Sequence, residues 1–248
     1  MTRVQLLGPV RAWQDGVELP LGPSRQRALF AVLAASTGRV VGRDELAHAL
    51  WGEHPPGQTA NSLYTYVSRL RRVLRETGAP PIQSAGSGYR LRVDPEAVDL
   101  LAATRSRQLS AELARQRGPG LACQVVEQAL ACWRGRAFDD VDGPFAEAGR
   151  VQAEELRLEL LERRAGFQLD CGQAAEVATD LSGLVRAHPN RESLRSLLML
   201  ALHRTGRRAD ALALYQDTRR HLVAEMGLEP GAGLRRAHEL VLSGLEAG

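Results

Sequence analysis

Residues 59–76 read TANSLYTYVSRLRRVLRE, which is the pattern of an amphipathic helix. At about 100° per residue, the apolar residues of this stretch fall on one face of the helix. The opposite face carries amide, hydroxyl and guanidinium groups, the kinds that hydrogen-bond to base edges and phosphates. The residues on that face are Asn61, Thr65, Ser68 and Arg72, with Tyr64 and Arg69 beside them. On its own, such a helix is more typical of a solvated surface than of a binding site, so the flanking sequence decides the interpretation.

The sequence before this helix predicts a small antiparallel sheet and two further helices. Strands are expected within 4–8, 11–14 and 17–21, and helices at about 25–36 and 44–51. Asp15-Gly16 between apolar segments is typical of a β-hairpin turn. Val40-Val41 predicts a brief extended piece, and Trp51 is expected to face inward at the end of the second helix. The glycines and prolines of 52–58 predict a loop that leads into the helix at 59.

The sequence after this helix predicts a second hairpin. Residues 82–93 read IQSAGSGYRLRV, in which two alternating segments flank a small, glycine-rich turn. Three helices followed by such a hairpin, with the third helix basic, is the order of a winged helix-turn-helix. In that fold the third helix enters the major groove of DNA, and the hairpin is the wing.

Several residues strengthen this interpretation. The pattern TYVSRLRRVL from Thr65, with Gly86, Gly88, Tyr89 and Leu91 in the hairpin, resembles the OmpR-type winged helix. We therefore assign residues 1–94 to a DNA-binding domain of that type. The candidate DNA-binding residues are Asn61, Tyr64, Thr65, Ser68, Arg69, Arg72, Arg25, Ser87 and Arg90.

Three of the residues around these candidates have two readings. Arg25 and Ser24 stand at a helix start, where backbone N–H groups favour phosphate, but Ser24 is equally suited to cap the helix. Arg71 lies nearer the apolar face, so it either meets DNA or has a solvated or intramolecular salt-bridge role. Tyr89 either approaches the DNA backbone or anchors the hairpin in the core.

From residue 99 onward the sequence predicts helices alone, after a boundary at 94–99 that is rich in acidic residues. The expected helices are at about 99–116, 121–133, 144–170, 173–187, 191–204, 207–223 and 233–246. Gly172 and Gly206 each end one helix and precede the next, and they lie 34 residues apart, which is the tetratricopeptide period. The fold class is therefore mainly α with a small β part: an N-terminal winged helix-turn-helix, followed at 99–248 by an all-α tetratricopeptide-like helical domain.

Charge is unevenly spread over these two parts. Every basic residue is arginine, and residues 1–93 hold 12 of them against 6 acidic residues, whereas the whole chain has a net charge of +3. A basic N-terminal part indicates a polyanionic partner for that part. The N-terminus has no signal-peptide pattern and no segment is apolar enough to span a membrane, so we expect a cytoplasmic protein associated with the nucleoid.

The sequence contains no pattern for catalysis, a cofactor or a metal. A Walker loop is excluded because the chain has no lysine, and no H-E-x-x-H zinc motif is present. Asp139, Asp140 and Asp142 lack the EF-hand pattern, so we read them as a loop between helices. Cys123, Cys132 and Cys171 form no C-x-x-C pair and are expected to be reduced. We expect no enzyme activity, no cofactor and no metal.

The two parts together resemble the Streptomyces antibiotic regulatory protein family. Residues 211–242, with the turn MGLEP at 226–230, and the segment ALACWRG at 129–135 are similar to its bacterial transcriptional activation domain. The resemblance implies an activator of secondary-metabolite gene clusters that binds direct repeats in double-stranded DNA as a head-to-tail homodimer. It also implies recruitment of RNA polymerase through the sigma or alpha subunit.

Two alternatives stay open at this point. Larger members of the family continue into a nucleotide-binding ATPase, so the chain is either a small regulator or the N-terminal DNA-binding and activation portion of a larger one. Alternatively, the helical part is a repeat module for protein interactions, with the winged part also serving protein contacts. The basic charge of residues 1–93 favours a DNA-binding regulator.

Overall fold

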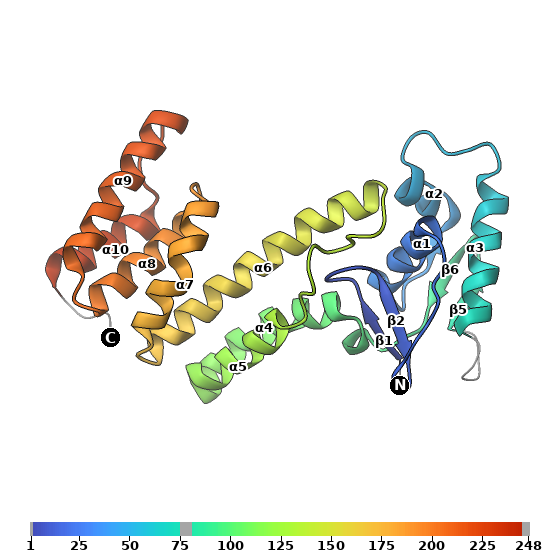
Figure 1. Ribbon diagram of the computed structural model, residues 1–248, viewed down its shortest axis with the longest axis horizontal. Coiled ribbons are helices and arrows are strands. Elements are labelled where there is room, and N and C mark those ends of the chain that lie inside the picture. The colour runs from blue at the N-terminus through green and yellow to red at the C-terminus, as the bar shows by residue number, and fades with distance from the viewer. Residues whose placement is uncertain (1, 75–80, 245–248) are drawn as a thin grey trace. The chain divides into compact units, whose positions relative to one another are not determined.

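The computed structural model describes residues 2–74 and 81–244, and their helices and strands are shown in Figure 1. By packing, the chain divides into two compact units. The first contains residues 1–108 and 127–158, and the second contains 109–126 and 159–248. These units are defined by which residues pack together, so each contains two separate segments of the chain. The domain boundary expected at 94–99 from the sequence stays a prediction.

The first unit begins with the predicted three-stranded antiparallel sheet, although its first strand lies earlier in the chain than the expected 4–8. Its strands are β1 (Thr2–Gln5), β2 (Arg11–Gln14) and β3 (Val17–Glu18), in the order β1-β2-β3. Gln14 pairs with Val17, so Asp15 and Gly16 form a two-residue turn. Both have positive φ angles, 50° and 87°, which a tight hairpin turn of type I′ requires.

The three predicted helices follow. They are α1 (Ser24–Ala35), α2 (Arg43–Trp51) and α3 (Thr59–Val73), with the short strand β4 (Val41–Gly42) between the first two. Helix α1 packs against both α2 and α3. Leu46 and Leu50 of α2 are fully buried, but Trp51 is only half-buried, which corrects its predicted inward position. The predicted end of α3 at 74–76 falls partly on residues 75 and 76, which lie outside the described ranges.

The wing is a hairpin of β5 (Ile82–Ala85) and β6 (Gly88–Leu91), and this prediction is confirmed. Strand β6 pairs with both β5 and β4, in the sheet order β4-β6-β5. A Cβ atom at Gly88 would lie 2.1 Å from the carbonyl oxygen of Val41, so the approach of β4 to β6 requires glycine at this position. The wing is thereby attached to the start of α2 as well as to its own hairpin partner.

The first unit is completed by residues from the helical part. After the short 3₁₀ helix η2 (Pro95–Ala97) come α4 (Asp99–Arg117), α5 (Pro119–Leu130) and α6 (Pro144–Asp170). Backbone N–H groups of Arg134 and Phe138 donate to the carbonyls of Leu7 and Leu6, at 2.7 and 3.0 Å. The segment between α5 and α6 therefore lies along the chain that connects β1 to β2. Helix α5 begins and ends two to three residues earlier than predicted.

The second unit contains the predicted helical repeat. Its remaining helices are α7 (Ala174–Ala187), α8 (Glu192–Arg204), α9 (Arg208–Met226) and α10 (Ala232–Ser243). Gly172 and Gly206 have φ angles of 80° and 77°. In both turns the residue after the glycine donates its N–H to a carbonyl five positions earlier, Gln173 to Gln168 and Arg207 to Leu202. These are equivalent helix C-caps one repeat apart, of the kind that glycine permits.

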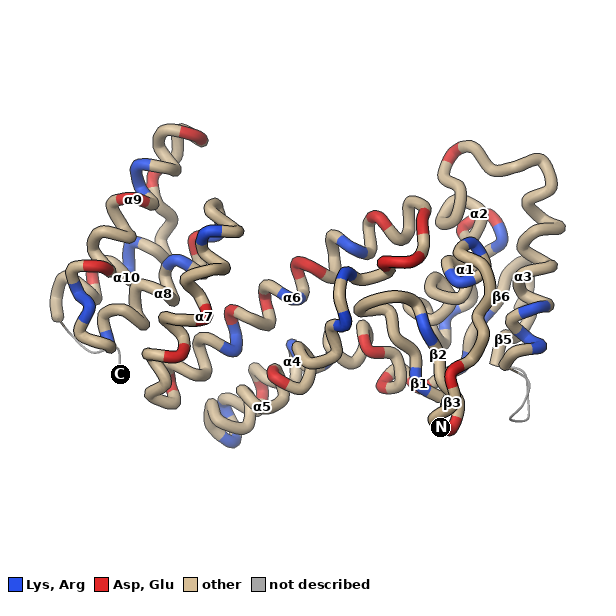
Figure 2. Tube along the Cα trace, in the orientation of Figure 1, with Lys and Arg blue, Asp and Glu red and all other residues tan. Residues whose placement is uncertain are grey.

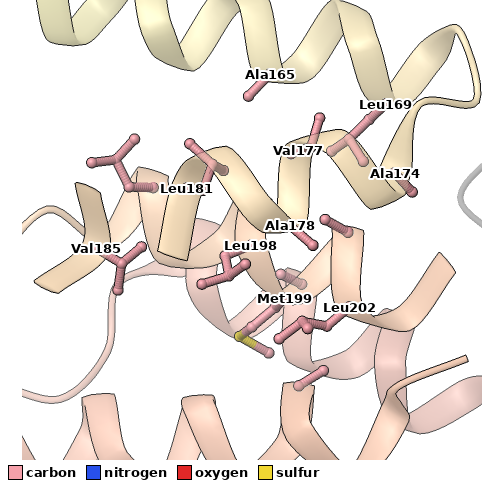
Figure 3. Close-up of a cluster of buried hydrophobic side chains, with 14 of the residues drawn as sticks. Ala165, Leu169, Ala174, Val177, Ala178, Leu181, Val185, Leu198, Met199 and Leu202 are labelled. Carbon is pink, nitrogen blue, oxygen red and sulfur yellow. The ribbon is translucent and has the colours of Figure 1, made fainter. Parts of the chain in front are cut away.

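The core of this unit is built from side chains at matching positions of the repeat. Val177 and Leu181 of α7, and Ala211 and Tyr215 of α9, are all buried. Figure 3 shows the cluster that α7 and α8 form with the end of α6, including Leu169, Leu198 and Met199. The tetratricopeptide-like packing inferred from glycine spacing is confirmed. Within residues 2–74 and 81–244, no helix combines the length and hydropathy of a membrane-spanning segment.

Candidate nucleic-acid interface

Helix α3 has one buried face and one exposed face, as its sequence predicts. Leu63, Val67 and Leu70 are at most 1% exposed and pack into the first unit. The exposed residues of α3 include all those proposed to meet DNA: Asn61, Tyr64, Thr65, Ser68, Arg69 and Arg72. Tyr64 is 68% exposed, which is unusual for a large aromatic side chain on a helix. Figure 2 shows the basic positions of α3 gathered towards its C-terminal end.

The polar side chains on this face differ in whether they already form hydrogen bonds or ion pairs within the protein. The hydroxyl of Thr65 donates to the carbonyl of Asn61, at 2.8 Å, and its oxygen can still accept a bond. Among the described residues, Arg69 and Arg72 have neither an ion pair nor a hydrogen bond from their guanidinium groups. Each guanidinium offers five donors in a planar fork, which suits a phosphate or the acceptor edge of guanine.

The wing contributes a smaller set of groups. Ser87 lies at the two-residue tip and is exposed, whereas Tyr89 is only 4% exposed. Of the two roles considered for Tyr89, the structure supports the core anchor. Arg90 is half-buried, and its Nε atom is buried without a hydrogen-bond partner in the described part of the chain. The candidates on α3 and on the wing thus belong to adjoining elements, since α3 packs against β5.

Arg25 is engaged within the protein. Its Nη1 atom donates to the carbonyl of Leu50, at 2.5 Å, and to that of Asp142, at 3.3 Å. The start of α1 is thus joined to the end of α2 and to the loop before α6. Helix α1 begins at Ser24 with Pro23 as its N-cap, so Ser24 stands one position too late for the capping role considered above. A DNA contact by Arg25 stays a prediction, and its guanidinium would have to share its donors with these carbonyls.

Two further arginines lie near the wing. The sequence pattern does not single out Arg43, and it leaves the role of Arg71 open. Arg43 follows β4 directly, its backbone N–H donates to the carbonyl of Ser87 at 3.2 Å, and its exposed guanidinium lies 5.9 Å from the centre of the Tyr89 ring. The sequence feature that could have pointed to Arg43 is its position just after the extended Val40-Val41 pair.

Arg71 donates from Nε to the carbonyl of Ile82 and from Nη2 to the hydroxyl of Ser84, at 2.9 and 2.8 Å. Arg71 therefore has intramolecular partners, but they are a neutral carbonyl and a hydroxyl, and within residues 2–74 and 81–244 it forms no salt bridge.

The first unit also contains a cavity that, unlike the basic exposed face of α3, is lined in part by a carboxyl group and a thiol. It has a volume of about 590 Å³ and is lined by β1, η2 and the facing ends of α4 and α5, with Asp99 and Cys132 among its lining residues. The Asp99 carboxylate accepts the backbone N–H groups of Leu6, Leu7 and Leu100, at 2.8, 3.1 and 2.7 Å. Burial raises the pKa of Asp99 to about 6, against the lowering effect of these three bonds. No residue of α3 or the wing lines this cavity, so it is separate from the candidate interface.

Over residues 2–74 and 81–244, no group of three or more His, Cys, Asp or Glu side chains is arranged to hold a metal ion.

Comparison with known proteins identifies both parts of the chain. Residues 98–242 match the bacterial transcriptional activator domain family, and residues 17–91 match the family described as transcriptional regulatory protein, C terminal. Regulatory protein DnrI of Streptomyces peucetius is 33% identical over 249 residues, which cover 97% of this chain and 92% of DnrI. The chain belongs to the Streptomyces antibiotic regulatory protein family of transcriptional activators.

Relatives in this family differ in length. Regulatory protein AfsR of Streptomyces coelicolor is 44% identical over 244 residues, 97% of this chain, but the match spans only 24% of AfsR. A solved structure of Mycobacterium tuberculosis EmbR, in complex with a low affinity phosphopeptide, superimposes with a TM-score of 0.92 at 32% identity. It covers 98% of this chain and 65% of that one, so the arrangement of helices and strands described above is shared by a family relative.

Proposed function

We propose that this antibiotic regulatory protein binds double-stranded DNA through α3 and the wing, with α3 in the major groove. The observation that carries the proposal is the exposed face of α3, where Arg69 and Arg72 stand without partners in the described chain beside Asn61, Thr65 and Ser68. When the protein docks on DNA, the two guanidinium groups lose their hydrogen bonds to water. Hydrogen bonds to anionic phosphate or to guanine would replace them. The wing, with Ser87 at its tip and Arg90 on its return strand, would then reach the DNA backbone.

The finer parts of the proposal rest on family membership. We propose that the target is the promoter of a secondary-metabolite gene cluster, and that two copies bind direct repeats head to tail. The activation domain would then recruit RNA polymerase through its sigma or alpha subunit. Because each copy reads a short site, two adjacent sites would multiply the specificity of one.

A second form of the proposal follows from the length of the relatives. The match spans 24% of AfsR, so a segment similar to nearly the whole of this chain also occurs within a much longer regulatory protein. In that form the chain's binding to DNA would be unchanged, but its control would lie in further domains.

The decisive experiment is selection of genomic DNA by the purified chain at moderate salt, followed by sequencing of the bound fragments. Enrichment of upstream regions with two direct repeats about one helical turn apart supports the proposal and names the target. The matched control is the double variant Arg69→Ala/Arg72→Ala, which keeps the buried face of α3 and is expected to enrich nothing. Salt-sensitive binding without enrichment would mean that the arginines supply charge alone, and would contradict sequence-specific regulation.

A further inference from the structure

Arg71 occupies the last turn of α3, between the exposed face of that helix and the wing. Two of its guanidinium nitrogens are used by β5: Nε donates to the backbone carbonyl of Ile82, and Nη2 donates to the hydroxyl of Ser84. Its guanidinium carbon also lies 5.8 Å from the centre of the Tyr89 ring. The side chain therefore touches both strands of the wing, since Tyr89 belongs to β6.

The register of the hairpin explains why one side chain can make all three contacts. Ser84 pairs with Tyr89 across the β5–β6 ladder, and Ile82 lies two residues before Ser84 on the same strand. Side chains that lie directly opposite on paired strands share one face of the sheet, so the Ser84 hydroxyl and the Tyr89 ring are neighbours, whereas the contact to Ile82 is made to its backbone carbonyl. A planar guanidinium with donors at fixed angles meets these groups together and can lie against the aromatic ring.

Arg72 provides the contrast within the same turn of helix. It is exposed and, within the described ranges, makes no hydrogen bond, ion pair or ring contact to the wing, whereas Arg71 is half-buried. One position along a helix rotates a side chain by about 100°, which separates a residue facing the wing from one facing solvent. The two adjacent arginines therefore face different surroundings: Arg71 faces the wing and Arg72 faces solvent.

We propose that Arg71 is a positioning residue: it fixes the angle between the recognition helix and the wing and does not itself contact DNA. This inference rests on the proposed function, because it assumes that both elements dock on one duplex. A wing held against α3 enters the groove or meets the backbone without first being ordered, so the cost of ordering is met when the protein folds. A free wing would meet that cost at each binding event.

The first test compares Arg71→Met with Arg72→Met in the full chain. Methionine keeps much of the apolar stem and removes every donor. We expect Arg71→Met to weaken binding to the preferred site by roughly tenfold, the scale set by two lost hydrogen bonds. The dependence of log K on log salt should stay as in the wild-type protein, because no phosphate contact is removed. Arg72→Met should instead reduce that slope by about one if Arg72 contacts a phosphate.

The second test needs no DNA. Amide hydrogen exchange in β5 and β6 should be faster in Arg71→Met than in the wild-type protein, and unchanged in Arg72→Met. Ser84→Ala should show a smaller acceleration, and the double variant Arg71→Met/Ser84→Ala should be no worse than Arg71→Met alone, because the two residues share one contact. Arg71→Lys should recover only part of the protection, since an ammonium group lacks the planar fork.

The outcomes separate this inference from the function on which it rests. If Arg71→Met lowers the salt slope by about one, Arg71 contacts DNA and the inference is wrong. Unchanged affinity, or unchanged exchange in the wing, also overturns it. If the wild-type chain binds no DNA, the proposed function fails and this use of Arg71 fails with it, while the exchange data still report whether Arg71 holds the wing.

Discussion

Arg27 and Asp140 lie 113 positions apart in the sequence and form an ion pair, with Arg27 Nε 2.9 Å from a carboxylate oxygen of Asp140. The other carboxylate oxygen accepts the backbone N–H of Val10, at 2.7 Å, and Arg27 Nη2 also donates to the Asp140 carbonyl, at 3.1 Å. Asp140 therefore ties α1 and the β1–β2 connection to the loop before α6. A residue of the segment that matches the activator domain is therefore part of the structure that carries α3, the proposed recognition helix.

Replacing Asp140 by alanine should destabilise the first unit. The change leaves the partly buried guanidinium of Arg27 without its carboxylate and the N–H of Val10 without its acceptor. Each loss of this kind costs on the order of 1–3 kcal/mol, and because Arg27 and Asp140 are partly exposed we expect about 2 kcal/mol in total. Urea unfolding followed by circular dichroism measures the difference.

Asp139→Ala is the matched control for this variant. Asp139 is the neighbouring acidic residue, its side chain is exposed, and its structural contact is a backbone hydrogen bond from its N–H to Gly8. Its replacement removes the same charge and should change stability by no more than about 0.5 kcal/mol. If both variants lower the free energy of unfolding equally, the effect comes from the change in net charge, and the Arg27–Asp140 pair does not stabilise the fold.

Asp99 should make stability depend on pH in mildly acidic solution. Burial raises its pKa from the ordinary value of 3.8 to about 6, so the folded protein holds a proton on Asp99 over a pH range in which the unfolded chain has lost it. A raised acid pKa means that folding is favoured at low pH and that this contribution is lost as the pH rises from about 4 to about 6. The shift corresponds to about 2–3 kcal/mol.

The measurement is the difference in unfolding free energy between wild type and Asp99→Asn at intervals from pH 4 to pH 7. Asparagine cannot ionise, so the wild-type protein should lose about 2–3 kcal/mol relative to the variant over this range and show no further change above it. Taking the difference cancels the titration of other carboxyl groups. A difference that does not vary with pH would show that the pKa of Asp99 is not raised.

The elements of the candidate interface could be predicted because they depend on local sequence. The spacing of Leu63, Val67 and Leu70 fixes the buried face of α3, and the polar residues between them are exposed as a consequence. The wing followed from alternating residues on either side of Gly86 and Ser87. The repeat in the second unit followed from glycines at equivalent helix ends, because a left-handed C-cap strongly favours glycine.

The tertiary contacts of single polar residues could not be predicted in this way. The place of Arg25 at a helix start predicts a contact to DNA phosphate and gives no sign of its bonds to the carbonyls of Leu50 and Asp142, 25 and 117 positions away. Asp140 was read as part of a polar loop, although its carboxylate binds α1 and the chain after β1. An exposed and a partnered arginine have the same local pattern, and only the packing of distant segments tells them apart.

Arg72→Ala should weaken binding to the preferred DNA site by about 1–3 kcal/mol if its guanidinium reads a base. The reason is its exposed position on α3, opposite the buried Leu63 and Leu70. Fluorescence anisotropy with the selected site measures the effect. Arg186→Ala removes the same charge from an exposed position on α7 of the second unit and should leave affinity nearly unchanged. If both variants bind as the wild type does, Arg72 is not a contact residue.

A fragment of residues 1–93 should be less stable than the first unit of the full chain. In the full chain, Asp99 and Asp140 accept the N–H groups of Leu6, Leu7 and Val10, and N–H groups of residues 134 and 138 donate to the carbonyls of Leu7 and Leu6. The fragment loses all of these bonds and uncovers apolar side chains beside them. We expect a loss of at least about 3 kcal/mol in the free energy of unfolding.

A fragment of residues 1–158 is the control, because it contains every residue of the first unit. It should recover most of the stability that 1–93 loses. Both fragments should bind DNA more weakly than the full chain if residues 159–248 take part in dimerisation, and 1–93 should bind more weakly than 1–158 because less of it is folded. Equal apparent affinity of 1–93 and 1–158 at the same total protein concentration would show that α1, α2 and α3 keep the proposed DNA-binding surface folded without help from the activation domain.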